Sequence, residues 1–108
     1  MSHAELVDAI VDAARWYGWR VAGFRPARTD HGWRTAVLGD GKGWPDLVLV
    51  GHDRVLFREV KVGRDRLSAE QRQWRDALRD VGADWAEWRD VDWPTGIVTE
   101  LSRVRVSS

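Results

Sequence analysis

Two carboxylates and one ammonium, those of Asp46, Glu59 and Lys61, lie in or beside two short apolar segments joined by a Gly-His-Asp sequence. The β-branched composition of both segments predicts two strands, and the polar residues between them predict a hairpin turn. If the hairpin is centred between His52 and Asp53, Asp46 faces Glu59 across the two strands. The two-residue period of a strand then places Lys61 on the same face as Glu59.

Two like charges placed directly opposite each other destabilise a sheet unless a positive charge lies between them. A hard cation such as Mg²⁺ binds carboxylate oxygens and would relieve this repulsion. A second interpretation stays open, in which Lys61 completes a partly buried ion triplet without any metal. The presence of lysine at position 61 favours a catalytic role over a purely structural one, because the chain has 15 arginines but only two lysines, Lys42 and Lys61. Lysine can take part in proton transfer, whereas arginine effectively cannot.

Length and composition limit the possible classes of protein. The 108 residues predict one small domain spanning residues 1–108. The absence of cysteine excludes a disulfide framework and a thiolate metal site. No apolar run approaches the roughly 18 residues of a membrane span, and the first residues lack a signal-peptide pattern. We therefore expect an intracellular, soluble, cytoplasmic protein without a membrane partner.

The order of hydrophobic patterns predicts an α/β fold. The expected elements are a helix over residues 4–17, strands over 19–24, 43–50, 54–61 and 83–88, a helix from Ser68 to Val81, and a helix from about 92 to 102. This order, α-β-β-β-α-β-α, predicts a mixed sheet of about four strands flanked by helices.

Basic side chains concentrate around the predicted hairpin although the whole chain has no net charge. Residues 15–66 carry an excess of five positive charges, and residues 25–45 form a long polar connection in which arginines alternate with tryptophans. Such a mixture suits a phosphate backbone and exposed bases, although an ordinary solvated loop with buried tryptophans fits equally well. The candidate nucleic-acid contacts are Arg25, Arg28, Arg34, Lys42, Arg64 and Arg66.

Two further polar residues have more than one interpretation. Ser68 to Gln71 is a capping-box sequence, with Gln71 at the head of the inward-facing stripe of its helix. Gln71 can therefore cap the helix or reach the three ionisable residues, and both possibilities stay open. Glu5 lies off the apolar stripe of the first helix, and periodicity alone favours an acidic first-turn residue stabilised by the helix dipole.

The sequence Gly43-Trp44-Pro45-Asp46 followed by Glu59-Val60-Lys61 resembles the signature of the PD-(D/E)xK nucleases. Within that superfamily the chain is similar to the VRR-NUC family in its stand-alone form. The similarity also includes Glu5, Gly18-Trp19, Arg66-Leu67-Ser68, Glu70-Gln71, Trp88-Arg89 and Asp92-Trp93. Two positions depart from the pattern, since Gly23 and Asp90 stand where members often have His and Pro.

The resemblance implies a restriction-endonuclease-like core that cleaves phosphodiester bonds with Mg²⁺ or Mn²⁺. Asp46, Glu59 and the Val60 carbonyl would hold the metal, with Glu5 as an outer metal-site residue. Lys61 would orient and help deprotonate the attacking water, with support from Gln71. Only the resemblance, and not the residue pattern, assigns this role to Glu5.

Three functions remain to be distinguished on this basis. The first is a homodimeric endonuclease of branched DNA, similar to a Holliday-junction resolvase, because a two-fold dimer suits a symmetric junction. The second is a nuclease that nicks or restricts linear duplex. The third is a nucleic-acid-binding module in which the three ionisable residues form only a structural ion pair.

Overall fold

The computed structural model describes residues 1–24, 27–29, 32–34 and 38–103. The helices are α1 (His3–Trp16), α2 (Ala69–Asp80) and α3 (Thr95–Ser102), with a 3-10 turn η1 (Asp90–Asp92). The strands are β1 (Arg20–Gly23), β2 (Ala27–Thr29), β3 (Gly32–Arg34), β4 (Leu47–Gly51), β5 (Arg54–Lys61) and β6 (Asp84–Arg89). None of the described helices is long and apolar enough to cross a membrane.

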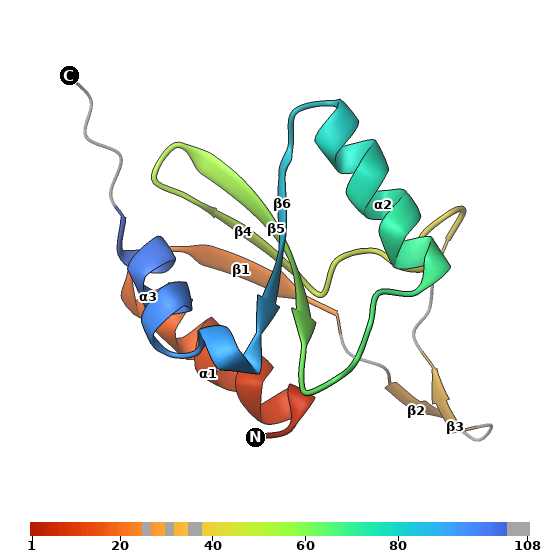
Figure 1. Ribbon diagram of the computed structural model, residues 1–108, viewed down its shortest axis with the longest axis horizontal. Coiled ribbons are helices and arrows are strands. Elements are labelled where there is room, and N and C mark those ends of the chain that lie inside the picture. The colour runs from red at the N-terminus through yellow and green to blue at the C-terminus, as the bar shows by residue number, and fades with distance from the viewer. Residues whose placement is uncertain (25–26, 30–31, 35–37, 104–108) are drawn as a thin grey trace.

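A mixed four-stranded sheet has the order β1-β4-β5-β6 (Figure 1). The pairs β1–β4 and β4–β5 are antiparallel, whereas β5 and β6 are parallel. A parallel pair needs a long crossover between its strands, and α2 provides it here. The predicted α/β fold, with a mixed sheet of four strands flanked by helices, is therefore confirmed.

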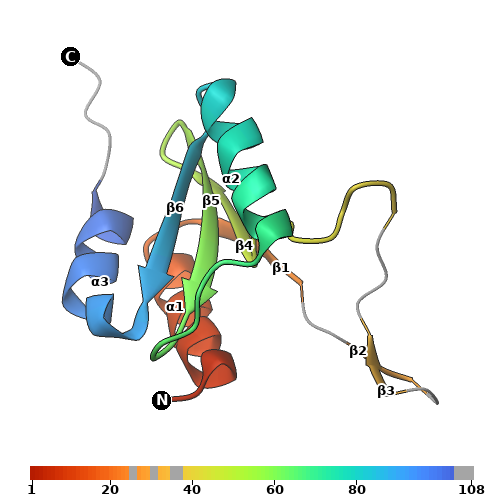
Figure 2. The same cartoon turned by 45° about the vertical axis from the view of Figure 1, so that its right-hand side comes forward.

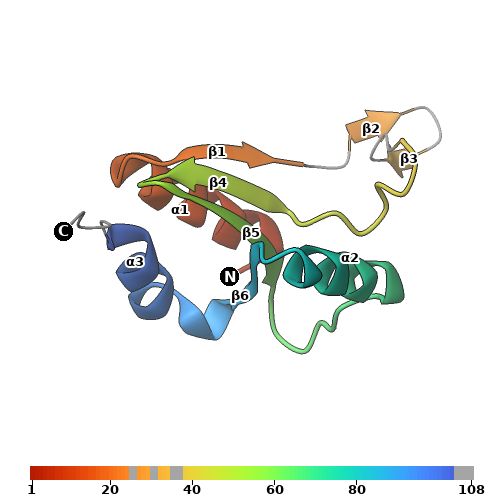
Figure 3. The same cartoon turned by 90° about the horizontal axis from the view of Figure 1, so that it is seen from above.

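The strands β2 and β3 form a separate small antiparallel sheet within the connection that we expected to be a polar loop. Each of these strands has three residues, which is too few to show a period of two in the sequence. The small sheet extends away from the four-stranded sheet (Figures 1 and 3).

Helices cover the two faces of the four-stranded sheet unequally. The main core lies between one face and the helices α1 and α3, whereas α2 packs on the opposite face against β6 (Figure 2). Trp88 belongs to the main core, and Trp85 on the other face contacts Arg79 of α2. The fully buried apolar side chains of the main core are Leu6, Ile10, Ala14, Leu47, Leu49, Leu56, Ile97 and Leu101.

One charged side chain, that of Arg58, is buried on the main-core face of β5 and is 1 % exposed. Its guanidinium donates to the Asp84 carbonyl oxygen at 2.7 Å, pairs with the Glu100 carboxylate, and lies 5.2 Å from the centre of the Trp88 ring. Trp88 also donates its indole N–H to the other carboxylate oxygen of Glu100 at 3.0 Å. Arg58 therefore links β5, β6 and α3 from within the core.

We expect the substitution Arg58→Ala to lower the free energy of unfolding by about 3–5 kcal/mol, because it leaves the partly buried Glu100 without its cation. Urea denaturation followed by tryptophan fluorescence measures the change. The matched control is Arg64→Ala, which removes an exposed arginine and should change stability by no more than about 0.5 kcal/mol. Equal effects of the two substitutions would contradict the structural role of Arg58.

Candidate active site at the open end of the hairpin

The hairpin of β4 and β5 has the register that the sequence predicts. Val50 pairs with Val55 and Leu47 pairs with Arg58, so the next pair beyond the ladder is Asp46 and Glu59. Both turn residues have a left-handed backbone, with φ of 51° at His52 and 61° at Asp53. This conformation is typical of two-residue hairpin turns whose twist matches the strands, and it fixes the register.

The side chain of Asp46 makes a hydrogen bond to β5 just beyond the last backbone pair of the hairpin. Its Oδ2 atom accepts the backbone N–H of Val60 at 3.0 Å, immediately beyond the last strand pair. The carboxylate is therefore held against β5 at the open end of the hairpin. Its side chain is 23 % exposed and so can be reached from solvent.

Glu59 and Lys61 lie beside Asp46, and we refer to Asp46, Glu59 and Lys61 as the carboxylate–lysine cluster. Glu59 is 2 % exposed, and its Oε1 atom lies 4.0 Å from the Lys61 ammonium nitrogen. The Lys61 side chain is 14 % exposed. The structure thus brings the three residues together at one end of β5.

The pKa of the Glu59 carboxyl group lies far above its ordinary value. Burial raises its pKa to about 9, the Asp46 charge and a hydrogen bond with Asp46 act in the same direction, and Lys61 opposes them. The cation of Lys61 thus offsets only part of the burial and repulsion. Without a further cation, the Glu59 carboxyl therefore keeps its proton at neutral pH.

Gln71 serves both of the functions that the sequence left open. Its Oε1 atom accepts the backbone N–H of Ser68 at 2.8 Å, and Ser68 Oγ accepts the backbone N–H of Gln71 at 3.1 Å, so the predicted capping box is confirmed. Its Nε2 atom donates to Glu59 Oε1 at 3.0 Å. The helix cap therefore fixes the side chain that holds Glu59.

Gly43 allows the first turn of α2 to approach the segment before β4. Its φ is +87°, and a Cβ atom at this position would lie 2.5 Å from the carbonyl carbon of Glu70 and 2.7 Å from the backbone nitrogen of Gln71. The indole of Trp44 packs against the rings of Phe57 and Trp74, with centroids 5.7 and 4.8 Å away. The close contact between Gly43 and the first turn of α2 therefore fixes the position of Gln71. The ring contacts of Trp44 hold the same segment against β5 and α2.

His3 is a part of the site that the sequence did not indicate. Its Nε2 atom lies 3.2 Å from Asp46 Oδ2 and 3.1 Å from the Val60 carbonyl oxygen. The first turn of α1 lies beside the end of β5 (Figures 1 and 2). A histidine near a helix start carries no signal of such a contact, because the contact depends on how α1 packs against β5.

Glu5 has a local partner instead. Its Oε1 atom accepts the backbone N–H of Ser2 at 3.0 Å in a capping box, and this hydrogen bond lowers the pKa of the Glu5 carboxyl. The side chain is exposed. This position agrees with the first-turn role that periodicity favours, and a role at a metal would need the carboxylate to leave Ser2.

The candidate nucleic-acid contacts are only partly described. Arg64 and Arg66 are exposed between β5 and α2, and Lys42 is exposed in the segment before β4, where it pairs with Glu70 at 3.4 Å. Arg25 lies outside the described residues. The backbones of Arg28 and Arg34 belong to β2 and β3, while their side chains lie outside the described part of the structure. The three exposed cations are thus Lys42, which precedes Asp46 in the chain, and Arg64 and Arg66, which follow Lys61.

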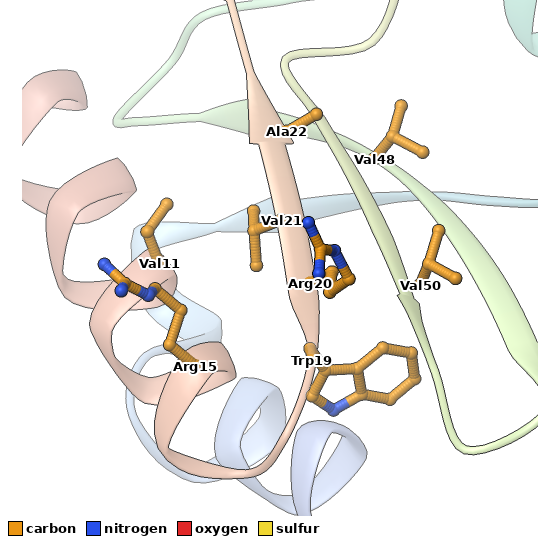
Figure 4. A pocket seen from close by; sticks show the side chains of 8 residues that line it. All are labelled: Val11, Arg15, Trp19, Arg20, Val21, Ala22, Val48 and Val50. Carbon is orange, nitrogen blue, oxygen red and sulfur yellow. The ribbon is translucent and has the colours of Figure 1, made fainter.

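A hollow of about 760 Å³ lies away from this cluster, beside the edge strand β1. Two arginines and six apolar residues line it, and they come from α1, β1, β4 and the residue before β1 (Figure 4). These residues are Val11, Arg15, Trp19, Arg20, Val21, Ala22, Val48 and Val50. With no carboxylate, nucleophile or histidine in its lining, the hollow offers no group for acid–base or metal chemistry.

The donor atoms of the cluster fit a hard divalent cation. Asp46 Oδ2 and the Val60 carbonyl oxygen both contact the same atom, His3 Nε2, at 3.2 and 3.1 Å. Glu59 adds a carboxyl whose pKa is raised by burial and by the neighbouring Asp46, so a bound cation would favour its ionised form. Within the described residues, no three acidic, cysteine or histidine side chains form a metal site by themselves. A backbone oxygen and waters would complete the coordination, as is usual for Mg²⁺.

A protein-family model matches the part of the chain that contains this cluster. The family model of the VRR-NUC domain matches residues 27–91, which is more than half of the chain and includes Asp46, Glu59, Lys61 and Gln71. A comparison with curated proteins finds no match.

The pKa of Glu59 predicts how the stability of the metal-free protein depends on pH. The folded protein keeps the Glu59 proton up to a pH of about 9, whereas the unfolded chain loses it near the ordinary value of 4.5. Between these values the unfolded state binds fewer protons, so the free energy of unfolding falls as pH rises, by at most about 1.4 kcal/mol per pH unit. Urea denaturation in EDTA at several pH values measures this slope.

The matched variant for this experiment is Glu59→Gln, which keeps the shape of the side chain and cannot ionise. Its stability relative to the unsubstituted protein should increase as pH rises from about 5 to about 9. Parallel stability curves for the two proteins would contradict the raised pKa.

The contact of Gly43 with α2 gives a second prediction. Gly43→Ala should displace the first turn of α2 and weaken the hydrogen bond from Gln71 to Glu59, because a Cβ atom would overlap the helix backbone. Gly39→Ala is the control, since its φ is also positive, at +58°, but no heavy atom lies within 4 Å of the added Cβ. The left-handed backbone should lower the free energy of unfolding of both variants by about 1–2 kcal/mol. Only Gly43→Ala should also shift the NMR signals of the Gln71 side-chain amide, and equal spectra would refute this account.

Proposed function

This chain belongs to the VRR-NUC family of nucleases, and we propose that it is a metal-dependent endodeoxyribonuclease that hydrolyses phosphodiester bonds. The observation that carries the proposal is the meeting of Asp46, Glu59 and Lys61 at the open end of one hairpin. Asp46, Glu59 and the Val60 carbonyl would hold Mg²⁺ or Mn²⁺. When bound, this cation would polarise the phosphate, stabilise the charge that develops on it and make a water more acidic.

Lys61 would act on the attacking water. Its ammonium lies beside the buried Glu59 carboxyl and is still partly open to solvent, at 14 % exposure. A water next to this nitrogen can be held by hydrogen bonding. It could give up its proton to the neutral amine that forms once the ammonium has released a proton to solvent. Few other side chains are needed, because positioning and electrostatics supply most of the acceleration in phosphoryl transfer.

Gln71 would be a positioning residue in this reaction. The helix cap holds its Oε1 atom at Ser68, so its Nε2 atom is directed at Glu59 Oε1. The amide thus limits the rotation of the Glu59 carboxyl. Glu5 would join an outer shell of the metal only by exchanging its Ser2 contact for a water-mediated one.

We propose DNA, and in particular branched DNA such as a four-way junction, as the substrate. The exposed cations Lys42, Arg64 and Arg66 flank the cluster and would contact phosphates. The hairpin β2–β3 extends from the same side of the molecule as the start of α2 (Figure 1). A homodimer would present two such sites to a two-fold symmetric junction. We expect this nuclease to act inside the cell.

The test is a cleavage panel with a four-way junction, a flap and the linear duplex arms, each in Mg²⁺, Mn²⁺ or EDTA. The proposal predicts cleavage that needs a divalent metal and is faster on the junction than on its arms. Faster cleavage of the linear arms would replace the junction by duplex as the substrate. If no substrate is cut with either metal while DNA is still bound, the protein is a binding module.

Two substitutions test the roles of single residues in the same panel. Lys61→Arg keeps the positive charge but removes the group that transfers the proton, so it should lower the cleavage rate by about 10²–10⁴-fold without a comparable loss of DNA binding. Asp46→Asn can still accept the Val60 N–H and should keep the fold, but it should abolish cleavage. Arg15→Ala, at an exposed position near the other end of α1, is the control and should cleave normally.

A further inference from the structure

The N-terminus of α1 brings an imidazole into contact with two of the proposed metal ligands. His3 Nε2 lies 3.2 Å from Asp46 Oδ2 and 3.1 Å from the Val60 carbonyl oxygen. Both oxygens are hydrogen-bond acceptors, so one nitrogen atom lies between two groups that each attract positive charge. The contacts join residues that are 43 and 57 positions apart in the chain, and therefore depend on the packing of α1.

The two distances match those between neighbouring ligands of one cation. An octahedral ion with bonds of about 2.1 Å separates adjacent ligand atoms by about 3.0 Å. His3 Nε2 has this spacing from both oxygens. Each of these two oxygens could therefore be a ligand next to His3 Nε2 on one cation.

The surroundings of the imidazole also permit a metal. The His3 side chain is 48 % exposed and that of Asp46 is 23 % exposed, so a cation and its waters can reach them from solvent. A neutral histidine that carries its proton on Nδ1 presents a free lone pair at Nε2. Coordination would therefore require only the change of tautomer that places the proton on the other ring nitrogen.

We propose that His3 is a direct ligand of the divalent metal, through Nε2, and that it makes the site prefer Mn²⁺ to Mg²⁺. This inference rests on the proposed metal site of Asp46 and the Val60 carbonyl oxygen. Imidazole is a good ligand for transition metals, whereas Mg²⁺ prefers oxygen and retains its waters. One nitrogen among oxygen ligands thus shifts the preference toward Mn²⁺ without excluding Mg²⁺.

A purely structural role for His3 makes a different prediction. If Nε2–H only donates hydrogen bonds to Asp46 and Val60, a glutamine at this position can replace it with its own amide N–H groups. A glutamine amide cannot give the nitrogen coordination of an imidazole. His3→Gln therefore separates the ligand from the hydrogen-bond donor, and His3→Ala removes both.

The experiment measures metal binding by the untagged full chain without DNA, so that it does not depend on cleavage. Isothermal titration calorimetry gives the Kd for Mn²⁺ and for Mg²⁺. Pulsed electron paramagnetic resonance of the bound Mn²⁺ detects the nuclear coupling of a ligated imidazole nitrogen. The control is His52→Gln, which removes a histidine at the turn end of the hairpin, where its Nε2 atom lies 2.7 Å from the Tyr17 carbonyl oxygen.

The proposal predicts nitrogen coupling in the unsubstituted protein and in His52→Gln, and its loss in both His3 variants. Mn²⁺ binding should weaken by about tenfold or more in both His3 variants, because even the outer partners of metal ligands contribute that much affinity. The Kd for Mg²⁺ should change less than that for Mn²⁺.

Two results would overturn the proposal, and each has a distinct meaning. If the unsubstituted protein binds Mn²⁺ without nitrogen coupling, and Asp46→Asn abolishes this binding, the metal site stands but His3 is not its ligand. If the unsubstituted protein binds neither metal and also fails to cut DNA, the proposed nuclease site itself is wrong.

Discussion

The site depends on one hydrogen bond, which joins the backbone N–H of Val60 to the carboxylate of Asp46 at 3.0 Å. The bond forms because the turn at His52 and Asp53 sets an antiparallel register in which Asp46 follows the last paired residue of its strand. A slip of one residue would turn Asp46 to the other face and away from Glu59. The geometry of a distant turn therefore determines which carboxylates meet.

The second support of the site is α2, whose first turn touches the segment before β4 at Gly43. The same turn begins with the capping box of Ser68 and Gln71, and the Gln71 side chain also contacts Glu59. A cap normally satisfies backbone groups at the start of a helix. Here its second polar atom also satisfies a buried carboxyl, so the start of the helix and the orientation of Glu59 are linked.

The sequence predicts those parts of the fold and site that follow from local patterns. The hairpin register, the helix cap at Ser68 and the order of the elements are of this kind, because each depends on residues close together in the chain. The contact of His3 with Val60 and the burial of Arg58 depend on packing between distant segments. The sequence does not decide between the two roles of Gln71, helix cap and partner of Glu59, because the roles do not conflict. The structure contains both.

The strand β5 carries buried ionisable residues on both faces. Arg58 points into the main core toward Glu100, and the next residue, Glu59, points to the opposite face toward Gln71. Local opening of this strand would break both contacts at once and expose two unpaired polar groups. Among the described strands, β5 is thus one of the least able to open without unfolding of the whole domain. The proposed chemistry would therefore take place on a strand that resists local opening.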